Sequence, residues 1–134
     1  MSQNTIFYRH DKLGTLEHLV GPEVRRIAED IVVNGNTSKM PELKNLLIES
    51  VIQDEGFLST SYRQDAFVYE KGLEIRIYAP KGFKGGLFLE EISEFQRERE
   101  YLFAPGQKFE VLDVEVGEVY QWGKNLILHV VPVE

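Results

Sequence analysis

The sequence predicts a single α+β domain, because helix-like patterns fill its first half and strand-like patterns its second. The chain has 134 residues, of which 43% are hydrophobic, and this is enough for one core of ordinary size. No internal repeat, low-complexity tract or linker-like Pro/Ser run divides it. We therefore expect one domain over residues 1–134.

The first half combines one strand with short helices. The aromatic run Ile6-Phe7-Tyr8-Arg9 predicts an opening strand. Apolar residues then recur every three or four positions from Leu16 to Val33, a helical stripe that Gly21-Pro22 interrupts, so two short helices are expected. After a polar loop at 34–38, helical spacing resumes from Pro41 to Ile52.

Strand patterns begin after Gly56, and the clearest is the period-two alternation from Leu73 to Tyr78. The segment Glu90 to Glu100 is ambiguous, because its interleaved charges also suit a salt-bridged amphipathic helix. If it is extended, Glu98 and Glu100 share one face. The further strands are expected at 57–61, 86–88, 101–103, 108–116 and 125–133.

Composition excludes several classes of function. A formal charge of −7 and a pI near 5.0 argue against binding a nucleic-acid backbone, which needs a basic face. Without cysteine, and with three scattered His residues, the sequence shows no metal-binding spacing. The first twenty residues lack an apolar core, so we expect neither a signal peptide nor a membrane span.

Three separated features carry groups suited to chemistry: Tyr8-Arg9, the run 56–61 with its Ser59-Thr60-Ser61, and the run 95–103 with Glu98 and Glu100. Each has an ordinary interpretation when taken alone. A strand-end arginine is usually exposed, hydroxyl residues suit an edge strand, and paired acids are usually solvated.

In order and spacing, the three features resemble the Arg, Ser-Thr-Ser and Glu-x-Glu signature of the mono-ADP-ribosyltransferases of bacterial exotoxins and phages. The resemblance implies N-terminal helices packed on a two-sheet mixed β core of the ADP-ribosyltransferase type. It also implies an enzyme that cleaves NAD, releases nicotinamide and transfers ADP-ribose to a side chain of a protein acceptor. The expected acceptor side chain is arginine. The resemblance extends to the flanking runs 78–82, 85–88 and 106–109.

The resemblance also implies roles for individual residues. Arg9 would bind the NAD phosphates, for which a guanidinium is well suited. Glu100 would stabilise the positive charge that develops on the ribose during cleavage, as carboxylates do in glycoside hydrolysis. Ser59 would orient Glu100, and Thr60 and Ser61 would shape the strand beneath the nicotinamide.

Four further residues complete the implied site. Glu98 would take the proton of an arginine acceptor, which otherwise stays charged. Phe95 would recognise the target protein, although a buried packing role suits it equally. Phe67 would pack on the nicotinamide ring, with simple core packing as the alternative. His10 stands where many relatives have Gly, next to the motif arginine in the NAD-binding region.

Other departures from the family pattern bear on partners and location. The segment 68–72 lacks the arginine that often contacts a phosphate, so Arg63 or Lys71 would substitute. Arg9 stands close to the start of the sequence, so we expect no counterpart within it of the helical layer that many toxins carry ahead of the first strand. We expect NAD as substrate, no metal, a host protein as acceptor, and action in the host cytoplasm or within a phage or larger toxin polypeptide. An NAD glycohydrolase and a catalytically silent phage structural domain remain the alternatives.

Overall fold

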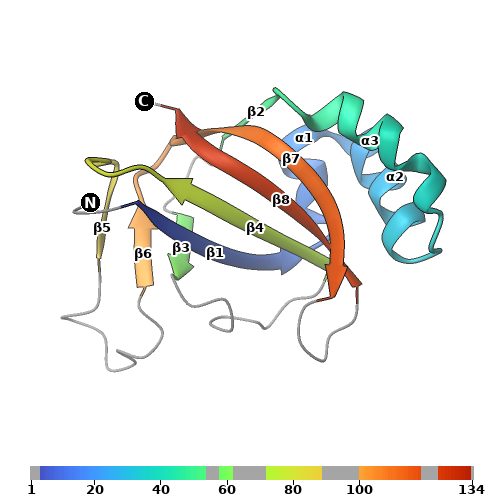
Figure 1. Ribbon diagram of the computed structural model, residues 1–134, viewed down its shortest axis with the longest axis horizontal. Helices are drawn as coiled ribbons and strands as arrows, with labels where there is room; N and C mark the ends of the chain where they lie inside the picture. Colours follow the sequence, from blue (N-terminus) through green and yellow to red (C-terminus); the bar gives the residue numbers. More distant parts are fainter. Residues whose placement is uncertain (1–3, 54–57, 62–71, 89–99, 119–123, 134) are drawn as a thin grey trace.

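A computed structural model of the protein describes residues 4–53, 58–61, 72–88, 100–118 and 124–133 (Figure 1). Within these ranges, the helices fall between the first two strands. In chain order the elements are β1 (Thr5–Lys12), α1 (Thr15–Val20), α2 (Pro22–Val32), the 3₁₀ turn η1 (Thr37–Lys39), α3 (Met40–Leu47), β2 (Val51–Gln53), β3 (Leu58–Ser61), β4 (Gly72–Ala79), β5 (Gly86–Phe88), β6 (Glu100–Phe103), β7 (Lys108–Glu118) and β8 (Lys124–Val133).

The described strands form one curled mixed sheet in the order β2-β7-β8-β4-β1-β3-β6-β5. Within it, β4 and β8 pair in parallel and the other neighbours pair antiparallel. Figure 1 shows β3, β5 and β6 running across the direction of the longer strands β1, β4, β7 and β8.

The expected division into two sheets is not confirmed, because β1 hydrogen-bonds to neighbours on both sides. On one side it pairs with β4 along its whole length, from Thr5 opposite Ala79 to Lys12 opposite Gly72. On the other side it pairs with β3 at Tyr8 and Ser61. This contact keeps the hydrogen bonding continuous while β3 turns away from the long strands.

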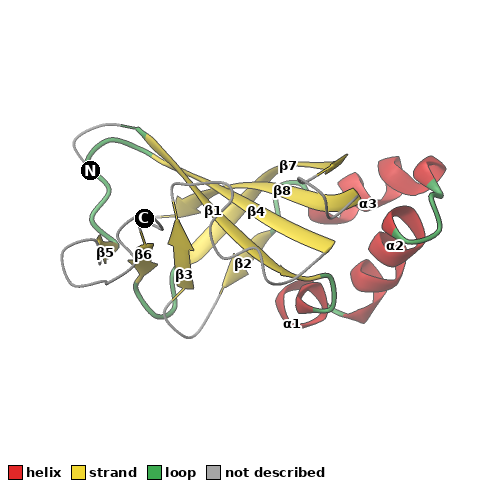
Figure 2. Cartoon of the chain, turned by 90° about the horizontal axis from the view of Figure 1, so that it is seen from below, coloured by secondary structure: helices red, strands yellow, loops and turns green. Residues whose placement is uncertain are grey.

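The helices lie against one face of the long strands (Figure 2). The predicted break between two short helices is confirmed: Gly21, at φ 98°, separates α1 from α2, and Pro22 starts α2. Proline fits the first helical turn because its missing N–H would have no partner there. The predicted helix to Ile52 is wrong beyond Leu47, since Glu49 at φ 73° reverses the chain and 51–53 pair with β7 instead.

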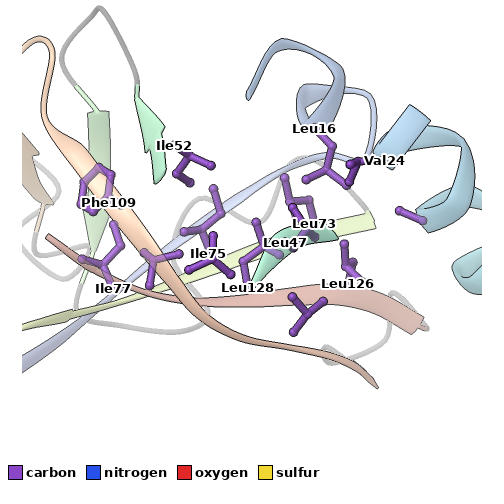
Figure 3. Packing of buried hydrophobic residues seen from close by; sticks show 14 of the residues in the cluster. Leu16, Val24, Leu47, Ile52, Leu73, Ile75, Ile77, Phe109, Leu126 and Leu128 are labelled. Atoms are coloured by element: carbon purple, nitrogen blue, oxygen red, sulfur yellow. The ribbon is translucent and has the colours of Figure 1, made fainter. Parts of the chain in front are cut away.

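The predicted strands after Gly56 are confirmed to within two residues where the structure describes them, whereas the opening strand runs three residues beyond Arg9, to Lys12, because it pairs with β4 as far as Gly72. Their core-facing side chains form one hydrophobic cluster with the helices, and Figure 3 shows Leu16 and Val24 of the helices packed toward Leu73, Leu126 and Leu128. Burying each such side chain contributes about 1.5–3 kcal/mol. The ambiguous segment 90–99 lies outside the described residues, and Glu100 is the first residue of β6.

Candidate functional site

Arg9 lies in the middle of β1, where its side chain is 28% exposed. Its Nε donates a hydrogen bond of 2.6 Å to Oδ2 of Asp11, which lies on the same face because it is two residues further along the strand. The pair lines a small pocket between β1, α1 and the β2 edge, which has a cavity volume of about 20 Å³ and is partly open to solvent. Its other lining residues are Thr15, Leu19, Ile52, Gln53, Ile75 and Phe109.

The predicted motifs lie on three adjacent strands. Ser59, Thr60 and Ser61 belong to β3, which is hydrogen-bonded to β1 on one side and to β6 on the other. Glu100 begins β6 and is the direct partner of Ser61. The structure therefore brings together the arginine strand, the Ser-Thr-Ser strand and the strand of the second glutamate. Glu98, Phe67 and Phe95 lie outside the described residues.

Four residues that pair directly with one another form a row across these strands and β4. Tyr8 is the direct partner of Ser61 on β3 and of Arg76 on β4. Because Ser61 is in turn opposite Glu100, the four residues occupy consecutive positions across β4, β1, β3 and β6. We call this set the Arg76–Glu100 row. Arg9 is outside it, because its partner on β4 is Ile75.

His10 is buried on the opposite face of β1 from Arg9. Its Nε2 lies 2.8 Å from Oε1 of Glu74, and the two side chains are 2% and 0% exposed. The carboxylate can only accept, so His10 Nε2–H is the donor. Among the described residues Nδ1 of His10 has no hydrogen-bond partner. His10 is thus buried against Glu74 on the face of the sheet away from Arg9 and α1.

Glu74 also accepts a hydrogen bond of 2.5 Å from Nε of Arg76 through its second oxygen. The guanidinium carbon of Arg76 lies 5.9 Å from the ring centroid of Tyr8, within cation–π range. Burial alone would lower the pKa of Arg76, but the hydrogen bond and charge of Glu74 outweigh it and raise that pKa. Sequence reasoning missed this group, although the alternation in β4 already gives Glu74 and Arg76 a common face.

A second polar group lies on the same side of the sheet. The hydroxyl of Tyr78 lies 2.7 Å from Nδ1 of His129, whose Nε2 lies 2.9 Å from Oε1 of Glu115. Burial raises the pKa of Tyr78. The arrangement joins β4, β8 and β7 across the sheet.

Two negative findings hold for the described residues alone. No group of three or more His, Asp or Glu side chains in these ranges is arranged to hold a metal ion. Helices α1, α2 and α3 are all too short or too polar to cross a membrane.

The fold resembles that of bacterial ADP-ribosyltransferase toxins. The chain superimposes on C3stau2 from S. aureus, solved with NAD, with a TM-score of 0.78 and 21% identity over 99% of this chain. For Plx2a, a toxin from Paenibacillus larvae, the TM-score is 0.77 with 17% identity over 100% of this chain. For the Clostridium limosum C3 exoenzyme the values are 0.75 and 18% over 100%.

At these identities the structural likeness establishes the fold, and the family follows from the sequence. A family model, the ADP-ribosyltransferase exoenzyme, matches residues 1–131. The chain therefore belongs to the ADP-ribosyltransferase exoenzyme family. It spans 63%, 63% and 62% of the lengths of the three structures above. A search of curated proteins found no match.

Proposed function

We propose that this protein is a mono-ADP-ribosyltransferase, which splits NAD, releases nicotinamide and transfers ADP-ribose to an arginine of a protein acceptor. The observation that carries the proposal is the adjacency of β1, β3 and β6, the strands of Arg9, Ser59-Thr60-Ser61 and Glu100, in a member of this family. The likeness to C3stau2, a protein of this fold that was solved with NAD, supports NAD as the substrate.

The residues present fit a substrate with two phosphates. Arg9 supplies a guanidinium at the edge of a partly open pocket, and Asp11 holds it through Nε. A guanidinium suits the oxygens of a phosphate group because its planar N–H donors match them in pairs. In an acidic protein such a placed cation is needed for NAD binding, and Arg9 takes that role in the proposal.

Glu100 supplies the chemistry of cleavage. Its carboxylate stabilises the positive charge that develops on the ribose as the bond to nicotinamide breaks. Ser59, two residues from the partner of Glu100 on β3, orients that carboxylate, while Thr60 and Ser61 form the strand beneath the nicotinamide. Phe67 packs on the nicotinamide ring.

The acceptor specificity rests on two residues. Glu98, two positions before Glu100, accepts the proton that an arginine must lose before it attacks the ribose. Phe95 contacts the target protein. A glutamate at the Glu98 position goes with arginine acceptors in similar proteins, which is why arginine is proposed here.

Label transfer tests this proposal. The purified protein is incubated with NAD labelled in the adenylate portion, together with either a cell lysate or poly-arginine, and both protein label and free nicotinamide are measured. Wild type should label protein, whereas Glu98→Gln should lose labelling and keep part of the nicotinamide release. Release without any labelled protein would favour a glycohydrolase, and an absence of both would contradict the enzyme proposal.

A further inference from the structure

The face of the long strands opposite the helices carries a group of aromatic and basic side chains that the proposed function has not used. Ile6 and Tyr8 of β1 pair with Tyr78 and Arg76 of β4, and Arg76 pairs in turn with His129 of β8. Directly paired residues point to the same side of a sheet, so these five side chains lie together. We call them the Arg76 patch.

A buried carboxylate fixes the guanidinium of Arg76. Its Nε donates to Oε2 of Glu74, whose side chain is 0% exposed and whose Oε1 accepts from His10. A buried carboxylate is stable only when it is paired and hydrogen-bonded, and here both of its oxygens are used. The Tyr8 ring lies 5.9 Å from the guanidinium carbon and limits it on one side. The guanidinium is therefore oriented before any partner binds.

The outer end of Arg76 is open to a partner. The side chain is 25% exposed, and within the described ranges neither Nη has a hydrogen-bond partner. The two Nη groups form a planar fork, which matches the two oxygens of a carboxylate. The exposed carboxylate of Glu115 on β7 is bound to His129 instead. In a protein of formal charge −7, this fixed cation gives a partner carboxylate a local place to bind.

A hollow beside the patch suits an apolar side chain. It has a cavity volume of about 430 Å³, is open to solvent, and is lined by Asn4, Thr5, Ile6, Tyr78, Ala79 and Pro80. Ile6, at its floor, is 39% exposed. Tyrosine and arginine are among the residues that contribute most to binding at protein interfaces. The Arg76 patch and the hollow together therefore have the composition of a protein-binding surface.

The Arg76 patch lies close to the proposed catalytic residue. In the Arg76–Glu100 row the two ends are three strand spacings apart, so their Cα atoms are separated by about 15 Å or less in a curled sheet. A specific protein interface covers about 800 Å² on each partner, which is roughly 30 Å across. A protein whose side chain reaches Glu100 can therefore cover the patch as well.

We propose that the Arg76 patch is a docking surface for the acceptor protein. The fork of Arg76 binds an aspartate or glutamate of the acceptor, and the hollow beside Ile6 receives one of its apolar side chains. The inference rests on the proposed function and leaves NAD binding to Arg9. It adds a property of the acceptor: the modified arginine shares a surface with an acidic residue about 15 Å away.

The test compares protein acceptors with an acceptor that has no side-chain carboxylate. Label transfer from NAD is measured with a cell lysate and with poly-arginine, and calorimetry measures affinity for a carbocyclic NAD analogue, which cannot be cleaved. Arg76→Gln is compared with Arg26→Gln, a change at an exposed arginine of α2. Because Arg76→Gln also removes a partner of the buried Glu74, Ile6→Ser is a second variant, with Val33→Ser at the exposed end of α2 as its control.

We expect Arg76→Gln to reduce the labelling of lysate proteins roughly tenfold or more, because the acceptor carboxylate loses its paired hydrogen bonds. Ile6→Ser should reduce it about threefold. Labelling of poly-arginine and affinity for the analogue should stay within about twofold of wild type, since neither involves an acceptor carboxylate. Arg76→Lys should fall between, because lysine keeps the charge without the fork. Both control variants should match wild type.

Other outcomes overturn the inference in distinguishable ways. An equal loss with lysate proteins and poly-arginine would place Arg76 in NAD binding or cleavage. Unchanged lysate labelling in Arg76→Gln, or in Ile6→Ser if the first variant does not fold, would remove the patch from acceptor binding and leave the proposed function standing. So would a wild type that labels poly-arginine in preference to every lysate protein.

Size-exclusion chromatography covers the remaining occupant. A wild-type dimer that Arg76→Gln dissociates would assign the face to a second copy of the chain and overturn the inference. A wild type that labels neither acceptor and releases no nicotinamide would defeat the proposed function as well.

Discussion

Arg9 and Asp11 form a close ion pair on the core-facing side of β1, with 2.6 Å between Nε and Oδ2 and side-chain exposures of 28% and 17%. The partly buried carboxylate restricts the rotation of the guanidinium. A guanidinium that rotates freely would lose conformational entropy when it binds a ligand, so the restriction lowers that cost. Asp11 is therefore expected to matter for NAD binding without contacting NAD.

Asp11→Asn tests this expectation, because it keeps the size of the side chain and removes its charge. KM for NAD should rise about three- to tenfold with kcat changed less than about twofold, the pattern of lost binding energy. Initial-rate measurements of nicotinamide release give both constants. Asp11→Glu should recover part of the loss. An equal fall in kcat and kcat/KM for Asp11→Asn would instead place Asp11 in the chemical step.

The aromatic cluster around Phe103 of β6 should carry much of the stability. Phe103 is 0% exposed, and its ring centroid lies 4.9–5.6 Å from those of Phe7, Phe83, Tyr101 and Phe109. Phe103→Ala is expected to lower the free energy of unfolding by about 3–5 kcal/mol, through lost burial and the cavity left behind. Urea denaturation measures this free energy. The control Val33→Ala, at a position that is 73% exposed, should lie within about 0.5 kcal/mol of wild type.

Asp30 links the end of α2 to the turn that follows. It accepts from Lys39 at 2.7 Å, Asn34 at 2.9 Å and Asn36 at 3.2 Å. These contacts, chiefly the one with Lys39, lower the pKa of Asp30 from 3.8 to about 2. Because the folded pKa is the lower one, the stabilisation is complete above about pH 4 and is lost as the pH falls toward 2.

Asp30→Asn should therefore melt at a lower temperature than wild type at pH 6, and the difference should shrink between pH 4 and pH 2. Calorimetric melting temperatures across this range give the comparison. A difference that stays constant with pH would show that the charge of Asp30 is not the source of the stabilisation.

Local patterns in the sequence predict most of the helices and strands. They miss elements that form only by pairing with a strand far away in the chain. Gly21-Pro22 separates two helices as predicted, since both residues act locally. The run to Ile52 keeps helical spacing, but β2 forms because 51–53 pair with β7 more than fifty residues away. Tertiary pairing overrides local preference at such positions.

The candidate site likewise contains residues that the sequence identifies and residues that it does not. Arg9, Ser59-Thr60-Ser61 and Glu100 are identified by order and spacing, and their strands prove adjacent. The pairing of His10 with Glu74 spans 64 positions, so no local pattern predicts it, and the alternation of β4 suggests a solvated face for a carboxylate that is in fact buried. Buried polar pairs between strands depend on which strands become neighbours, and one sequence does not specify that.

The most direct test of the proposed catalysis is the activity of Glu100→Gln, which keeps the shape of the side chain and removes the charge. If the carboxylate stabilises the developing positive charge, nicotinamide release should fall by about a thousandfold or more, with affinity for the carbocyclic NAD analogue unchanged within about threefold and an unaltered melting temperature. Release at the wild-type rate by the folded variant would contradict the assignment of Glu100 and the mechanism built on it.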